Sequence, residues 1–288
     1  MTAPRSLAAA LILLIVPAAA AQQGGSSLEI DKDLRVTAES SLEWNRGEQT
    51  YVARGNAVAR HKDQTLRADK LVAFYRRTGE GGDGGDVLGA DNVEIYRVEA
   101  TGGVRVSAPG GEVRGERGIY DLDEPVVVML GGDLQLETAG GNTVTADERL
   151  EFWPARDLAV ARGNAVATSG GRQLRARVIQ AIFAGKDTAR EVVRLEAFED
   201  VRVRLSDGTA RAETGLYDVG EEIAELFGSV RLERGGTRLQ GGYAEVDMGS
   251  GRSTLRAQAP GEGGSARVRG LIERPGVEPA AGGAGNPG

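Results

Sequence analysis

Apolar and polar residues alternate one by one through most of the chain beyond its N-terminal apolar segment. Val104-Arg105-Val106, Leu134-Gln135-Leu136 and Val201-Arg202-Val203 each place apolar side chains on one face of an extended segment and polar side chains on the other. Glycine-rich turns such as Pro109-Gly110-Gly111 and Ser169-Gly170-Gly171 separate these segments. A period of two residues indicates half-buried β-strands, and the turns predict antiparallel hairpins.

A short pattern recurs six times along this alternation. Its first half is Gly, Asn or Glu, then any residue, then Val or Leu, and it begins at Asn56, Gly102, Gly132, Asn164, Glu199 and Gly228. Its second half is an apolar residue, any residue, and Ala or Gly, as in Leu66/Ala68, Val113/Gly115, Val144/Ala146, Leu174/Ala176, Ala210/Ala212 and Leu239/Gly241. A unit of about 30 residues cannot cover its own apolar face, so the units must stack into one core.

The predicted fold is an all-β, elongated and twisted antiparallel structure of about six stacked repeats with open ends. Strict alternation predicts which apolar side chains face its interior. In four of the six second halves a further apolar residue lies six positions after the first one, and it is predicted to face inward as well. These interior residues are Val58, Leu66, Val72, Val104, Val113, Ile119, Leu134, Val144, Leu150, Val166, Leu174, Val201, Leu216, Val230 and Leu239.

The interior has two possible contents. A small residue ends every second half, as at Ala68 and Gly115, which means that either the facing sheet or a bound apolar molecule approaches closely there. Aromatic residues make up only 5% of the chain, so two long sheets have few large side chains with which to fill the space between them. A lightly filled sandwich is a slot for alkyl chains, whereas tight packing makes a thin, dry core.

Composition divides the chain into segments. Residues 1–21 resemble a secretion signal, with Arg5, an apolar run from Leu7 to Val16, and small residues before Gln22. Residues 22–33 form an N-terminal lead, and residues 34–258 form the repeat region, with an insertion loop at about 77–90. Residues 259–288, rich in Gly, Pro and Ala, are expected to be a disordered tail, although Val268–Ile272 has the composition of a last strand.

Little in the chain points to catalysis. Cysteine is absent, and the only histidine, His61, lies in a turn-like segment between cations. Carboxylates such as Asp69 and Asp147 recur with the repeat, which indicates a structural role, because a catalytic pair has no reason to be periodic. We therefore expect no enzyme activity, metal site or cofactor. The formal net charge of −7 argues against nucleic acid as the main partner.

Arginines mark the polar positions of the predicted strands. Two interpretations stay open: a soluble outer face that discourages wrong pairing, or a rim that meets the phosphates of an anionic lipid. The arginines concerned are Arg105, Arg175, Arg177, Arg202, Arg204, Arg211 and Arg231.

Both ends of the predicted stack are open. The first strand candidate is Leu34–Ala38 and the last secure one is Thr254–Ala257, and neither contains proline. Because unprotected edge strands invite another chain to continue the sheet, we expect head-to-tail self-association through Leu34, Val36 and Leu255.

Two of the repeats carry a recognisable motif. Arg54-Gly55-Asn56-Ala57-Val58-Ala59 with Leu66-Arg67-Ala68-Asp69, and Arg162-Gly163-Asn164-Ala165-Val166-Ala167 with Leu174-Arg175-Ala176, resemble the OstA-like repeat of the LptA family. The resemblance implies an open β-jellyroll in the periplasm whose interior shields the lipid A acyl chains of lipopolysaccharide. It also implies partners at both membranes, an inner-membrane exporter and an outer-membrane translocon, between which such proteins form a bridge.

Two alternatives remain beside this reading. A secreted structural β-repeat scaffold with a dry core predicts neither ligand nor groove. A carbohydrate-active enzyme on a β-solenoid requires a cluster of carboxylates outside the repeat register, which the sequence does not show.

Overall fold

A computed structural model describes residues 35–77, 93–185, 191–260 and 267–272 of the chain. These residues form eighteen β-strands and one short 3-10 helix, η1 (Pro154–Arg156). The strands are β1 (Arg35–Thr37), β2 (Ser41–Asn45), β3 (Thr50–His61), β4 (Gln64–Arg77), β5 (Val93–Ala108), β6 (Gly111–Asp121), β7 (Val126–Leu130), β8 (Leu134–Thr138), β9 (Thr143–Ala146), β10 (Arg149–Trp153), β11 (Leu158–Ser169), β12 (Arg172–Ala184), β13 (Glu191–Arg204), β14 (Gly208–Asp218), β15 (Ile223–Arg234), β16 (Thr237–Asp247), β17 (Ser253–Arg256) and β18 (Arg269–Ile272).

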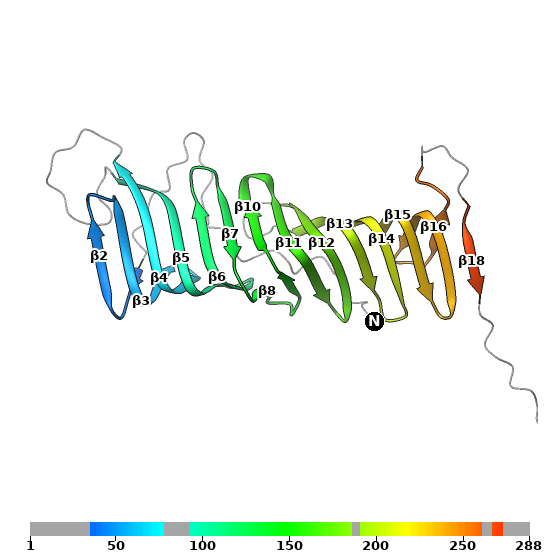
Figure 1. Cartoon of the computed structure of the whole chain (residues 1–288), viewed down its shortest axis with the longest axis horizontal. Helices are drawn as coiled ribbons and strands as arrows, with labels where there is room; N and C mark the ends of the chain where they lie inside the picture. Colours follow the sequence, from blue (N-terminus) through cyan, green and yellow to red (C-terminus); the bar gives the residue numbers. More distant parts are fainter. Residues whose placement is uncertain (1–34, 78–92, 186–190, 261–266, 273–288) are drawn as a thin grey trace, which may run out of the picture.

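All pairings between these strands are antiparallel, and the long strands pair with their neighbours in chain order. Figure 1 shows the resulting stack, which runs from β2 at one end to β18 at the other along the long axis of the molecule. The elongated, antiparallel all-β fold predicted from the alternation is therefore confirmed.

Five of the long strands, β3, β5, β11, β13 and β15, bend at a two-residue bulge near their middle. Both residues of each bulge have positive φ, and the pairing register shifts there. The bulges are Gly55-Asn56, Gly102-Gly103, Gly163-Asn164, Glu199-Asp200 and Gly228-Ser229. We call each of them a corner. Because bulges bend a strand and increase its twist, the corners fold the sheet along its length into two layers.

The two layers are defined by the short strands. The first layer contains β2, β7, β10 and β17 with the halves of the long strands that pair with them. The second layer contains β1, β8, β9 and β18 with the other halves. The repeated sequence pattern therefore marks the places where a long strand crosses from one layer to the other.

Three of the five corners, at Gly102, Gly163 and Gly228, pack against an acidic side chain of a neighbouring segment. A Cβ at Gly102, whose φ is +83°, would lie 2.2 Å from Oδ2 of Asp69, so only glycine fits there. Glu116, Glu148 and Glu213 occupy the equivalent place beside Gly131, Gly163 and Gly228. Asp69 thus has a structural place at a corner, whereas at Gly163 that place belongs to Glu148, and Asp147 instead accepts a hydrogen bond of 3.2 Å from Asn164 of the same corner.

The corners change which residues face inward. In β4, Ala68 and Leu71 are both buried in the core. The inward positions of β4 are therefore three residues apart where this strand lies opposite the corners of β3 and β5. Gly118 and Ile179 are the equivalent buried positions in β6 and β12. The inward residue thus lies five positions after the start of each second half in these strands, whereas strict alternation predicts six.

Three predicted interior residues are consequently wrong. Val72 pairs with Val52 and Glu99, Ile119 pairs with Glu99 and Val128, and Leu216 pairs with Glu196 and Glu225, all on the outer face of the first layer.

Two further predicted interior residues are wrong for a related reason. The corner begins at Gly55 and Gly163, one residue earlier than the sequence pattern assumed, so Ala57 and Ala165 are the residues with 0% exposure. Val58 and Val166 follow them along the strand and face outward. A shift of one residue transfers a side chain to the opposite face of a strand.

The middle of the molecule contains a distinct junction. Here the long strands are replaced by pairs of short ones, and β7 pairs with β10 in the first layer while β8 pairs with β9 in the second. We call this pairing the seam. One core cluster lies before it and another lies mainly after it, and Leu136 and Leu150 pack against both. A third core cluster crosses the seam, because it contains Val127 of β7 together with Phe152 of β10, so the two halves share part of their core.

The ends of the stack resemble the seam. Each end has one short strand per layer, β2 and β1 at the start and β17 and β18 at the finish. Because β18 forms at Arg269–Ile272, the expectation of a disordered tail is wrong for these residues, and the alternative of a last strand is the one observed. The expected signal, the lead with Leu34, most of the insertion loop and the rest of the tail lie outside the described residues.

Candidate functional site: an apolar trough between the layers

A continuous row of apolar side chains crosses the inner face of the first layer. Each member is directly opposite the next on the neighbouring strand, so the row runs along the long axis of the molecule. We call it the first wall. Its members are Tyr51, Ala73, Val98, Tyr120, Val127, Phe152, Ala159, Ala181, Leu195, Tyr217, Ala224 and Val246.

A second row crosses the inner face of the second layer in the same way. We call it the second wall. Its members are Val36, Ala59, Leu66, Val106, Val113, Leu136, Val144, Ala167, Leu174, Val203, Ala210, Leu232 and Leu239. Neither wall contains a charged residue.

The interior is closed beside the corners and open farther from them. Residues next to the corners are almost completely buried, with 0% exposure at Ala57 and Val104 and 1% at Val201 and Val230. Most residues of the two walls are only partly buried, including Leu66, Tyr120 and Leu195. The residues next to the corners are thus closed to water, while the walls keep part of their apolar surface exposed and form a solvent-accessible apolar trough.

A cavity of about 70 Å³ lies between the two walls at the seam. Its lining includes Val113, Leu136 and Val144 from the second wall and Val127 and Phe152 from the first. The rings of Phe152 and Phe183 meet edge to face with centroids 6.0 Å apart at its border. The two layers therefore do not fill the space between them at this point.

Aromatic side chains occupy the trough at its N-terminal end. Trp44 Nε1 donates a hydrogen bond of 2.8 Å to the hydroxyl of Tyr75, and the rings of Tyr51 and Tyr75 lie 4.9 Å apart. The guanidinium of Arg46 lies 4.3 Å from the centre of the Trp44 ring. These contacts gather several large side chains at one end of the trough.

The structure brings ten of the predicted interior residues to the inner face. Val104, Val113, Leu134, Val144, Val201 and Val230 are buried in the core clusters. Leu66, Leu150 and Leu174 pack against those clusters, and Leu239 lies in the second wall. Of the predicted end residues, Val36 and Leu255 face inward on the edge strands β1 and β17.

Sequence reasoning missed the whole of the first wall. Val127, Phe152, Ala181 and Leu195 lie in the strand halves between successive repeats, which the six-copy pattern does not cover. Their alternation, as in Val127-Val128-Met129, is obscured because outward positions of the first layer are also apolar in places. For Leu195, a period of two counted backward from the corner at Glu199 gives the inward face.

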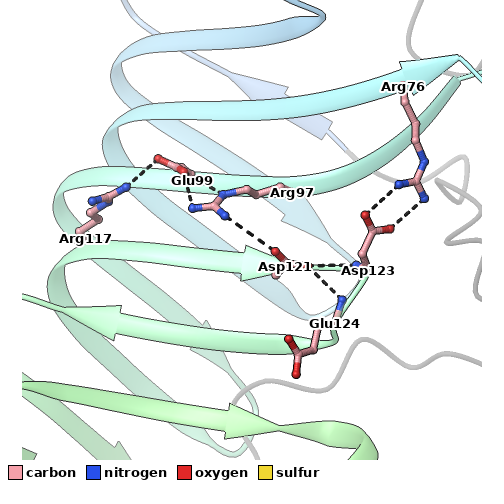
Figure 2. A network of polar contacts seen from close by, with 7 residues as sticks. All are labelled: Arg76, Arg97, Glu99, Arg117, Asp121, Asp123 and Glu124. Atoms are coloured by element: carbon pink, nitrogen blue, oxygen red, sulfur yellow. Dashed lines mark hydrogen bonds and ion pairs between the residues drawn. The ribbon is translucent and has the colours of Figure 1, made fainter.

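The outer face of the first layer is neutralised by ion pairs (Figure 2). Arg97 and Arg117 both bond to Glu99, at 2.8 and 3.0 Å, and Arg76 forms two hydrogen bonds of 2.8 Å with Asp123 at the β6–β7 turn. Burial alone would raise the pKa of Glu99, but the hydrogen bonds from Arg117 and Arg97 outweigh it and hold the pKa below its usual value. This network ties β4, β5, β6 and the following turn together.

The described residues hold no cluster of three or more His, Cys, Asp or Glu side chains arranged for a metal ion. His61 lies at the end of β3, next to the turn into β4. Among the described segments, no helix has the length and apolar character of a membrane span. The notable chemical property of the molecule is thus a long apolar surface that water reaches.

Comparison with known proteins agrees with the repeat. The model of the family described as LptA/(LptD N-terminal domain) LPS transport protein matches the chain twice, at residues 35–149 and 143–252. The two matches meet at the seam. No curated protein matches the chain.

A solved structure shares limited similarity. It is LptH of Pseudomonas aeruginosa, the LptA-homologous periplasmic component of the lipopolysaccharide transport device, with 17% identity and a TM-score of 0.41 over 46% of this chain and 95% of LptH. The two family matches together span most of the described residues. The chain therefore belongs to the family of LptA and LptD N-terminal-domain lipopolysaccharide transport proteins.

Proposed function

We propose that the protein binds lipopolysaccharide by enclosing its acyl chains in the trough while the sugars remain in water. The observation that carries this proposal is the pair of uncharged walls, which run the length of the sheet and stay partly exposed. Soluble proteins rarely leave long apolar surfaces in contact with water, and such surfaces mark binding sites.

Acyl chains suit these walls better than a compact apolar ligand does. Neighbouring wall residues are spaced by one strand, about 4.8 Å, so an extended hydrocarbon meets an apolar side chain at every strand. Burial contributes about 0.8 kcal/mol per CH₂, so an acyl chain gains affinity with each strand that it crosses. Most of this surface comes from Val, Leu and Ala, with Tyr and Phe added in the first wall.

The proposal includes a location and partners. We propose that the protein acts in the periplasm, as one part of a bridge between an inner-membrane exporter and an outer-membrane translocon. The seam supports end-to-end continuation, because it shows two family units joined by antiparallel pairing of short strands in both layers. No turnover chemistry is required of the trough, since the walls bind acyl chains by burial alone.

Photo-crosslinking tests the trough with two matched positions. Leu195 lies in the first wall and Leu216 on the outer face of the adjacent strand, and both are partly buried leucines. A benzoylphenylalanine replacing Leu195 is expected to crosslink purified lipopolysaccharide, whereas one replacing Leu216 is expected to give at most background. Leu136 in the second wall and Ile119 on the outer face form a second pair.

Equal crosslinking at the inner and outer positions would contradict the proposal. Absence of crosslinking at both Leu136 and Leu195, in variants that unfold with the wild-type midpoint, would favour a structural β-repeat scaffold without a ligand. The cavity at the seam and the partly exposed walls argue against that alternative, because a dry core requires the two layers to meet.

A further inference from the structure

The outer face of the second layer carries a row of arginines in direct cross-strand register. Arg175 of β12 is opposite Arg202 of β13, which is opposite Arg211 of β14, which is opposite Arg231 of β15. Each of the four is exposed and lies between two inward residues, as Arg202 does between Val201 and Val203. We call this row the arginine ladder; its side chains point away from the trough.

Most of the ladder has no acidic partner. Arg202 bonds to Asp200 at 2.7 Å, but among the hydrogen bonds and ion pairs of the described residues none involves Arg175, Arg211 or Arg231. Like charges directly opposite each other across strands are destabilising. The arginines of the first layer, such as Arg97 and Arg117, are by contrast paired with glutamate. The ladder is therefore a local cost to the fold that an external anion would offset.

A shorter ladder repeats the arrangement in the first half of the molecule. Arg67, Arg105 and Arg114 are opposite one another on β4, β5 and β6. Between the two ladders the same row continues through the uncharged Gln135, Thr145 and Val166. Both family units thus place arginines at the same position of the second layer, within a chain whose net charge is −7.

A row of mixed polar and charged side chains flanks the longer ladder. This adjacent outer row contains Gln173, Arg204, Thr209 and Glu233, directly opposite one another on β12, β13, β14 and β15. Gln240 continues the ladder itself beyond Arg231. Guanidinium groups bind carboxylate or phosphate in a bidentate manner, and hydroxyl and amide groups hydrogen-bond to sugar hydroxyls. The surface is thus suited to a saccharide that carries acidic groups.

We propose that the arginine ladder of β12 to β15 binds an extended anionic saccharide, with carboxylate or phosphate groups placed along its length. This inference is independent of acyl-chain binding in the trough, which lies on the other face of the layer.

Two features favour a saccharide over other polyanions. Adjacent strands rotate by about 20 to 25° relative to each other, so four successive arginines do not lie in one plane and a flat membrane meets only part of the ladder. The row contains no aromatic residue on which nucleic-acid bases could stack. A flexible chain follows the twist and needs no stacking platform.

Binding of a pectin-derived oligogalacturonate to the full chain, measured by calorimetry at low and physiological salt, tests the ladder. The double variant R211Q/R231Q is expected to bind at least about tenfold more weakly than the wild type, since each arginine loses a charge-assisted hydrogen bond. The control R54Q/R156Q removes the same charge from exposed ion pairs outside the ladder and is expected to change binding less than about twofold.

Folding and competing ligands are measured in the same series. R211Q/R231Q is expected to unfold at the same or a higher denaturant concentration than the wild type, because repulsion is removed. Neutral maltooligosaccharide, polyphosphate, single-stranded DNA and vesicles of phosphatidylglycerol and phosphatidylcholine are expected to bind more weakly than the oligogalacturonate. The proposal is overturned by absent oligogalacturonate binding, by an equal loss in the control, or by tighter binding of any of these other probes.

Discussion

At the scale of single residues, the corner of β13 differs from the others at two positions, and the two changes compensate each other. Four corners place glycine at their first position, and three of these glycines pack against an acid of the neighbouring strand. The corner of β13 has Glu199 there, with φ of +63°, and the neighbouring strand carries Arg177 in place of the acid, 3.7 Å away. An ion pair thus stands where glycine and an acid pack elsewhere.

Glycine is expected to suit this corner better than glutamate. A non-glycine residue in the left-handed region costs about 1–2 kcal/mol, whereas an exposed ion pair contributes about 0–1 kcal/mol. E199G should therefore stabilise the protein by up to about 1 kcal/mol in urea denaturation. The matched variant G102A should destabilise it by about 1–3 kcal/mol, because its Cβ meets Asp69. A lower midpoint for E199G would show that the Arg177 contact matters more than backbone strain.

A second residue-scale prediction concerns Glu151, which is 8% exposed on β10. Burial raises the pKa of its carboxyl, but hydrogen bonds from Trp153, Arg162 and Arg149 outweigh burial, and the pKa is lowered overall. A group with a lowered folded-state pKa contributes stability above its unfolded value of 4.5, and this contribution is lost as the pH falls through the folded value.

The variant E151Q tests this contribution. The free energy of unfolding should fall less between pH 6 and pH 3 in E151Q than in the wild type, while at pH 6 the variant should be less stable by about 1–3 kcal/mol. Identical slopes in the two proteins would mean that the carboxyl titrates alike in the folded and unfolded states.

At the scale of elements, the sequence pattern predicted strands and hairpins but not every inward face. Val104, Val201 and Val230 were assigned correctly because their two-residue corners directly precede them in the repeated pattern. Val72 and Ile119 were assigned to the wrong face. The strands that carry the second halves of the repeated pattern also shift by one position opposite a corner, and no residue type marks that shift. Alternation predicts faces only as far as the next bulge.

The first wall illustrates a different limit. Phe152 and Val127 lie on short strands that meet only across the seam, and their pairing depends on how the two halves join. Local sequence reports the period of a strand, not its partner.

A pair of adjacent residues in β4 tests the shifted faces. Leu71 is 6% exposed in the core with Ala53 and Ala100, while Val72 lies on the outer face beside Glu99. L71A should cost about 2–4 kcal/mol of unfolding free energy, and V72A about 1 kcal/mol or less. Strict alternation predicts the opposite order, so chemical denaturation of the two variants distinguishes the two registers directly.

At the scale of the whole molecule, the chain is two family units that share one sheet. The family matches meet at residues 143–149, where β9 and β10 begin the second half, and Leu136 and Leu150 connect the two cores. Across the seam Met129 is directly opposite Leu150. The cavity lies at this junction, so the trough passes from one unit to the next without a polar barrier in its walls.

The same inner row that contains Met129 and Leu150 ends in a leucine at both edges of the first layer. Leu42 of β2 is opposite Ala53 at one end, and Leu255 of β17 is opposite Ala244 at the other. Leu42 is 63% exposed because no strand follows it. Pairing of β17 with β2 of a second copy would place Leu255 beside Leu42, as the seam places Met129 beside Leu150. Self-association would thus extend the trough.

The variant L42D tests this arrangement against V193D, which changes another exposed apolar residue, 39% accessible, away from the ends. A buried unpaired carboxylate at the joint is strongly unfavourable, so L42D should weaken self-association at least about tenfold in light scattering at increasing protein concentration. V193D should associate as the wild type does. Crosslinking of lipopolysaccharide from position 136 should persist in L42D, because the trough near the seam is complete within one chain. Unchanged association of L42D would place the contact between copies elsewhere than at the ends of the sheet.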